Sequence, residues 1–167
     1  MTTLTSNTLR PARGLTLPPT PPAPPSNDRS RPSVLISPAQ AVQAAARAYS
    51  SSSLQPVCAP GAGLAYQPRS LLAVLTYCYA RNIFSSQEVE DMMRSDTALR
   101  SACGDDIPDA PTLRRFRRRN PEAIESCLFT VLRQLADQQG AHPADAEVME
   151  EAHQRLRLAM FVDLNEN

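Results

Sequence analysis

The sequence contains no tryptophan and no lysine, and aromatic residues make up 5% of its 167 positions. A core with so few aromatic rings must be built from Leu, Ile, Val, Met and Ala, which suit helix-on-helix packing better than a sandwich or barrel. Glycine is also scarce, with 5 residues against 16 prolines that cluster near the start. We therefore predict an all-α fold, a small helical bundle that occupies only part of the chain.

Long apolar runs and metal-ligand spacings are also missing. No stretch approaches the roughly 18 apolar residues that a membrane span requires, and the start lacks the apolar segment of a signal peptide. His142 and His153 have no cysteine or carboxylate at ligand spacing, and no glycine-rich phosphate loop occurs. We expect a soluble, cytoplasmic protein with no metal, no cofactor, no small-molecule substrate and no membrane partner.

The cysteines contain no CxxC pair, so a zinc site is not expected. Three of them fall on apolar helix faces, which favours small buried thiols in a reducing compartment. These three are Cys78, Cys103 and Cys127, and the fourth is Cys58.

The formal net charge is zero, because 17 basic residues balance 17 acidic ones, but the charges are separated along the chain. Residues 1–37 carry four arginines against one aspartate, Arg114 to Arg119 holds five arginines in six positions, and the tail from Ala141 is acidic. All 17 basic residues are arginine. This bias fits a GC-rich genome, and guanidinium is also the better group for bidentate phosphate and guanine contacts.

Composition divides the chain into four segments. Residues 1–37 include Pro-Pro-Thr-Pro-Pro-Ala-Pro-Pro and predict a disordered tail, either a solvated linker or a ligand for an aromatic groove. Residues 38–65 hold an Ala-rich helix that ends at Tyr49 and a Pro/Gly linker, so we expect this helix to be marginal and loosely attached. Residues 66–138 form the main helical domain, and residues 143–164 form a C-terminal helix.

Capping signals place the helix boundaries. Pro68 and Pro121 each stand where a helix begins, and the second of these helices ends near Gln138. Ser85-Ser86-Gln87-Glu88 is typical of a capping box, and Asp96 caps a predicted helix from Thr97 to Cys103. The last helix is expected to turn one apolar face inward, formed by Val148, Met149, Ala152, Leu156 and Met160.

The helix from Thr112 to Arg119 carries the densest charge in the chain. Leu113 and Phe116 fix the side that faces the core. At about 100° per residue, the side chains that then point away are Arg114, Arg115 and Arg118. Arg117 and Arg119 flank them. Like charges at this spacing repel each other, so an anionic partner is expected. We predict DNA phosphate, and the alternative is neutralisation by Glu122, Glu125 or the acidic tail. The predicted DNA-binding residues are Arg114, Arg115, Arg117, Arg118 and Arg119.

The order of short helix, turn, helix and basic helix fits a helix-turn-helix, in which one helix enters the major groove. Three stretches add to this pattern: Tyr66 to Leu72, Tyr77 to Ser86, and Pro108 to Arg117. They closely resemble the N-terminal helical domain of DDE-type insertion-sequence transposases of the InsH kind. The motifs of that family run Tyr-x-Pro-x-x-Leu-Leu, Tyr-Ala-x-Gly-x-x-Ser-Ser and Pro-Asp-His-x-Thr-(Leu/Ile)-x-Arg-Phe-Arg. Here Ala110 stands at the usual histidine, and Arg81 takes the position of a common glycine.

The resemblance covers about 70 residues and implies DNA binding. Such transposases hold divalent metal with three carboxylates on a separate ribonuclease-H-like domain. This sequence contains no such domain, and Asp163, after the apolar stretch Ala159 to Val162, is better explained as an acidic helix end than as a first catalytic aspartate. We therefore expect a non-catalytic module, either a stand-alone or a truncated transposase.

Other roles stay open at this point. In one alternative the protein is an interaction remnant, whose C-terminal helices pair with a second copy or with a full-length transposase. In another it is a decayed product without a selected role.

Overall fold

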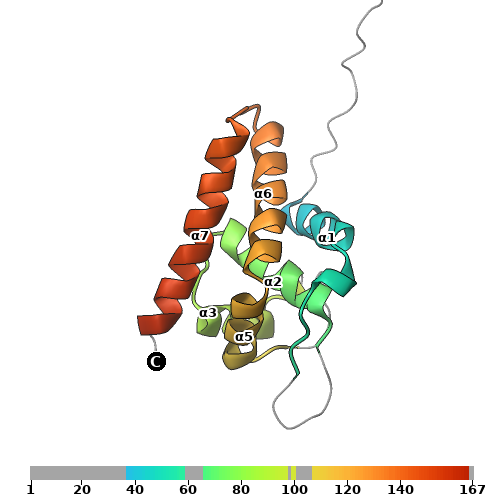
Figure 1. The fold of residues 1–167 in the computed structure, drawn as a ribbon, viewed down its shortest axis with the longest axis vertical. Helices are drawn as coiled ribbons and strands as arrows, with labels where there is room; N and C mark the ends of the chain where they lie inside the picture. Colours follow the sequence, from blue (N-terminus) through green and yellow to red (C-terminus); the bar gives the residue numbers. More distant parts are fainter. Residues whose placement is uncertain (1–36, 59–65, 98, 101–106, 166–167) are drawn as a thin grey trace, which may run out of the picture. The chain divides into compact units, whose positions relative to one another are not determined.

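The computed structural model describes residues 37–58, 66–97, 99–100 and 107–165. Within these ranges the chain forms α-helices and one short 3-10 helix, with no β-strand, which confirms the all-α fold class. No helix in the described ranges combines the length and hydropathy that a membrane crossing requires. The predicted tail and most of the predicted helix from Thr97 to Cys103 lie outside the described residues. The elements are α1 (Pro38–Ala48), η1 (Ser51–Ser53), α2 (Pro68–Ala80), α3 (Ser86–Ser95), α5 (Ala110–Arg119), α6 (Pro121–Gln138) and α7 (Asp145–Asn165) (Figure 1).

Helix starts follow the capping chemistry that the sequence predicts. The side chains of Ser37, Ser85, Asp96 and Asp109 each accept a hydrogen bond from the backbone N–H three residues later, at 3.3, 3.3, 3.0 and 2.8 Å. Each bond satisfies one of the amides that a helix start leaves without a partner. As predicted, α6 begins at Pro121 and ends at Gln138.

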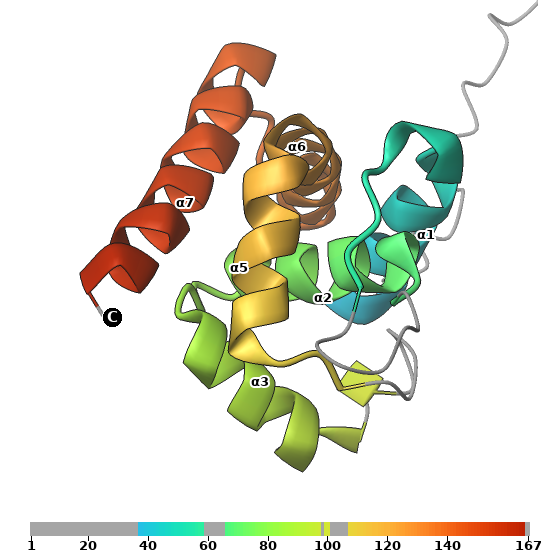
Figure 2. The ribbon, with the colours of Figure 1, turned by 60° about the horizontal axis from the view of Figure 1, so that its bottom comes forward.

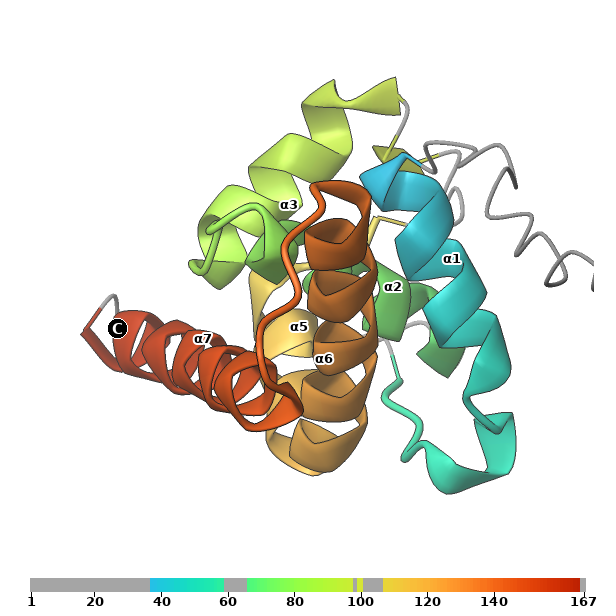
Figure 3. The same ribbon diagram turned by 90° about the horizontal axis from the view of Figure 1, so that it is seen from above.

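Helix α6 lies in the middle of the bundle and packs against α1, α2 and α7. Figures 2 and 3 show α1 and α7 on opposite sides of α6. Its inward side chains are aliphatic or small, as the amphipathic pattern predicts, and Cys78 on α2 is buried with them. Burial raises the pKa of the Cys127 thiol on α6, which keeps it protonated and unreactive. The buried residues of α6 are Ala123, Ile124, Cys127, Leu128 and Val131.

Helix α1 packs more tightly than the sequence predicted. We expected a marginal, loosely attached helix, but its apolar face belongs to the same core as α2 and α6. That face is built from Ala41, Val42, Ala45 and Ala46, all buried. Small side chains let the backbone approach its neighbours, and this tertiary packing outweighs the weak helix-forming tendency of a short segment.

The inward face of α7 differs from the predicted one. Met149 was expected inside but is 41% exposed, and Met160 is only partly buried. The buried stripe keeps three of the predicted residues, Val148, Ala152 and Leu156, and adds Ala159 and Asp163 in place of the two methionines. The buried residues of α7 are Val148, Ala152, Leu156, Ala159 and Asp163.

The turn after α2 corrects the position assigned to a family glycine. Arg81, which we placed at that position, has φ of −98°, whereas Asn82 has φ of 63°. Asparagine tolerates this left-handed conformation better than most residues, and glycine adopts it without strain. In this turn it is therefore Asn82, and not Arg81, that occupies the position a glycine would suit best.

Candidate functional site

Helix α5 presents its charges as the spacing of its apolar residues predicted. Leu113 and Phe116 are fully buried. On the opposite side Arg118 is exposed, and Arg114 and Arg115 are half-buried. We call the surface formed by Arg114, Arg115 and Arg118 the arginine face.

Helix α3 holds the start of α5. The buried carboxylate of Glu90 on α3 accepts a hydrogen bond from the backbone N–H of Ala110, the first residue of α5, at 2.7 Å. Its other oxygen pairs with Arg94. Carboxylates are favoured at a helix start because the exposed amides there carry partial positive charge. No sequence pattern indicates this contact, because the two residues are 20 positions apart.

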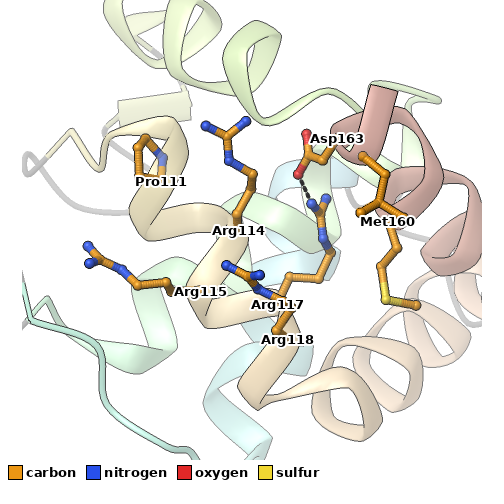
Figure 4. A pocket seen from close by; sticks show the side chains of 8 residues that line it. Pro111, Arg114, Arg115, Arg117, Arg118, Met160 and Asp163 are labelled. Atoms are coloured by element: carbon orange, nitrogen blue, oxygen red, sulfur yellow. Dashed lines mark ion pairs between the residues drawn. The ribbon is translucent and has the colours of Figure 1, made fainter. Parts of the chain in front are cut away.

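Arg117 does not lie on the arginine face. Its side chain is 2% exposed and forms an ion pair with Asp163 on α7 (Figure 4). It also donates a hydrogen bond from Nη1 to Tyr79 Oη at 2.7 Å and from Nη2 to Ser86 Oγ at 3.5 Å. A side chain held in this way is part of the core, so we leave Arg117 out of any surface interaction.

Asp163 links three helices through its carboxylate. Besides Arg117 on α5, it accepts hydrogen bonds from the backbone N–H of Ser86 at 2.9 Å and from Ser86 Oγ at 2.6 Å. Ser86 is the first residue of α3, where a carboxylate is favoured by the helix dipole. Asp163 does lie near the end of a helix, as expected, but its burial and its partners were missed.

A second side chain of α7 binds the end of α2. Arg155 donates from Nη1 to the backbone carbonyls of Tyr79 and Ala80 at 2.8 and 2.9 Å. A cation at these carbonyls complements the negative end of the helix. Helix α7 therefore binds both ends of the turn between α2 and α3, with Arg155 at the end of α2 and Asp163 at the start of α3.

Arg119 reaches toward a different part of the chain. Its Nη1 donates to the carbonyl of Pro56 at 3.0 Å, and the neighbouring Asn120 exchanges hydrogen bonds with the backbone of Gln55 at 2.7 and 3.1 Å. These contacts fix the segment after η1 against the end of α5. Arg119 is exposed but separate from the arginine face.

A pocket of about 480 Å³ lies between α5 and the end of α7. Figure 4 shows Arg117 crossing to Asp163, whereas Arg115 extends away from α7. No carboxylate of the described residues forms a salt bridge with Arg114, Arg115, Arg118 or Arg119. Among the described residues, the expected neutralisation by the acidic tail occurs at Arg117. The pocket is lined by Pro111, Arg114, Arg115, Arg117, Arg118, Met160, Asp163 and Leu164.

Other candidate groups have ordinary surface roles. His142 and His153 are exposed and contact Asp137 and Glu125, at 3.4 and 3.1 Å. No group of three or more His, Cys, Asp or Glu side chains that could hold a metal occurs in the part of the chain that the structure describes.

Comparison with known protein families places part of the chain in a described family. Residues 33–119, which are 87 of the 167 residues, match the family described as Transposase domain (DUF772). The matched range contains α1, α2, α3 and α5, and ends at the last residue of α5. No curated protein and no solved structure matches the chain.

Removal of one partner of the buried ion pair should destabilise the fold strongly. We expect Arg117→Met to lower the free energy of unfolding by about 3–5 kcal/mol, because it leaves the Asp163 carboxylate buried without its cation. The neighbouring Arg118→Met should change it by less than about 0.5 kcal/mol, since Arg118 is exposed. Urea denaturation followed by circular dichroism measures both. Equal costs for the two variants would contradict the buried pairing.

The phenol of Tyr79 should ionise at a higher pH than an unperturbed tyrosine, whose pKa is 10.0. Burial raises its pKa from 10.0 to about 12, although the Arg117 charge and hydrogen bond oppose the shift. Because the pKa of Tyr79 is higher in the folded than in the unfolded protein, burial of its neutral phenol contributes to stability. That contribution is complete below pH 10.0 and is lost as the pH rises to about 12. An ultraviolet titration of phenolate absorbance should show a late step that Tyr79→Phe removes. Ionisation of all four tyrosines in one step near the ordinary pKa would contradict this environment.

Proposed function

The chain belongs to the DUF772 family of transposase domains, and from this premise we propose that its arginine face binds the phosphate backbone of DNA. The observation that supports the proposal most strongly is the charge of α5. Three guanidinium groups share its outer face, and no carboxylate of the described residues forms a salt bridge with them. Phosphate oxygens supply the missing anions, and the planar guanidinium fork binds them in a bidentate manner.

The position of α5 suits a helix that docks on a duplex. It packs against α3, and Glu90 fixes its start while Arg117 anchors its last turn. A rigid support of this kind lowers the entropy lost on binding. We propose that α3 and α5 act as a helix-turn-helix-like pair, with α5 toward the DNA.

The arginine set in this proposal is smaller than the one expected from the sequence. Arg114, Arg115 and Arg118 contact phosphate. Arg119 lies outside the face, where its bond to the Pro56 carbonyl orients it, and Arg117 supports α5 from inside.

We further propose that the protein corresponds to the N-terminal domain of DDE-type insertion-sequence transposases of the InsH kind. In that role it recognises element ends or related sites without cutting them. Strand cleavage needs carboxylates that hold divalent metals at the attacking and leaving oxygens, and in this proposal a different domain or chain supplies them.

A second candidate function is binding of another protein chain through α7. Its outer surface exposes Leu158, Phe161 and Leu164 by 44%, 63% and 76%. Helix α6, the other predicted pairing helix, already packs against α1, α2 and α7. In this alternative a second copy or a full-length transposase covers the outer surface of α7. Sedimentation at several concentrations separates the two functions, since a chain that stays monomeric while it binds DNA supports the first.

Salt dependence of DNA binding tests the arginine face. We expect affinity for duplex DNA to fall steeply with salt, and replacement of Arg114, Arg115 and Arg118 by alanine to reduce the slope of log K against log salt by about three. A matched control replaces the exposed Arg47, Arg81 and Arg157, which removes the same charge elsewhere. Fluorescence anisotropy measures all three proteins. If both triple variants lose DNA affinity equally, the loss reflects net charge alone. That result would contradict the proposal that the arginine face is the DNA-binding surface.

A further inference from the structure

We propose that the pocket between α5 and the end of α7 binds one unpaired nucleotide of a DNA strand. The phosphate lies on Arg114 and Arg118, and the base lies against the apolar wall of Met160 and Leu164. This inference rests on the proposed function, because it gives the arginine face a second, more specific ligand.

The first argument is that the pocket joins two surfaces of different chemistry. One wall carries the guanidinium groups of α5, and the other carries the apolar end of α7, where Leu164 is 76% exposed. The backbone of an intact duplex offers charged phosphates and sugars but keeps its bases stacked inside. An unpaired nucleotide offers both an anion and a flat apolar ring, so it matches both walls.

The dimensions of the pocket agree with such a ligand. Its volume of about 480 Å³ falls within the range of roughly 300–1,000 Å³ that is usual for small-ligand sites. Guanidinium planes can also stack on bases, and proteins that bind single strands combine such contacts with positive charge along the backbone. Any of the four bases can stack, so the site selects for an unpaired state rather than for a sequence.

The floor of the pocket is fixed and electrically balanced. Arg117 and Asp163 both line it, and their ion pair cancels the carboxylate charge that would otherwise repel a phosphate. The hydrogen bonds of Asp163 to Ser86 hold this floor in place. The remaining guanidinium groups of Arg114, Arg115 and Arg118 therefore give the opening a net positive charge.

An energetic consequence follows for the state of the DNA. Extrusion of a base from a duplex costs a few kcal/mol, and a single strand or a mismatch avoids most of this cost. The pocket should therefore favour frayed ends, mismatches and single strands over a fully paired duplex. An amphipathic acidic peptide has a similar combination of charge and apolar surface, and it is the rival ligand that the experiment must exclude.

The test compares a fluorescein-labelled single-stranded oligonucleotide with a fully paired duplex of the same length and with an abasic strand. We expect Leu164→Ser to weaken binding of the single strand about tenfold, within the effect usual for loss of one base contact, and to leave duplex binding unchanged. Leu158→Ser is the matched control, since Leu158 lies on the same helix, is exposed, and does not line the pocket. The abasic strand should bind wild-type protein and Leu164→Ser equally.

The outcomes separate this inference from the proposed function. If Leu164→Ser binds the single strand as tightly as the wild type, or if Leu158→Ser weakens it equally, the nucleotide site is overturned while duplex binding by the arginines stands. Two results together would assign the pocket to a protein partner. In the first, a glutamate-rich amphipathic peptide displaces the labelled single strand. In the second, the abasic strand displaces it as well as the intact strand does. If neither arginine triple variant loses affinity for duplex DNA, the proposed function itself is contradicted.

Discussion

The rest of the structure depends on one buried ion pair, between Arg117 on α5 and Asp163 on α7. Burial of two charges is costly, and it is tolerated here because the carboxylate also accepts two hydrogen bonds from Ser86 and the guanidinium donates to Tyr79. The cluster therefore joins α2, α3, α5 and α7 at one point. This network constrains how the four helices meet, because separating Arg117 from Asp163 leaves a charge buried without its partner.

This arrangement has a direct consequence for the charged surface. Since Arg117 is held on the inner side of α5, the helix cannot rotate, and the other arginines of the helix must face outward or toward the segment after η1. The same network lies partly outside the range 33–119 that matches the transposase domain family, because Asp163 comes from α7. The matched region thus receives a buried ligand from the helix that follows it, and α7 is part of the structural unit in this protein.

Local features of the fold were predictable from sequence, and long-range ones were not. The limits of α6, the caps at Ser85 and Asp96, and the inward side of α5 depend on residues close together in the chain. The partners of Asp163 and Glu90 depend on which helices meet, and no periodicity within one helix carries that information. At the end of α7 the apolar Phe161 and Leu164 lie outside and the charged Asp163 lies inside, and the sequence analysis did not predict the burial of Asp163. Hydrophobicity predicts burial only on average, and a paired carboxylate reverses it.

The central claim is that one arginine of α5 is structural and that its sequence neighbour is available for binding. Modification of the native protein with an arginine-specific dicarbonyl reagent, read by mass spectrometry, tests it most directly. Arg118 is exposed and should react early, whereas Arg117, at 2% exposure and paired with Asp163, should react only after unfolding. DNA should then protect Arg118 and leave the reactivity of Arg117 unchanged. Reaction of Arg117 in the native protein as fast as that of Arg118 would contradict the account.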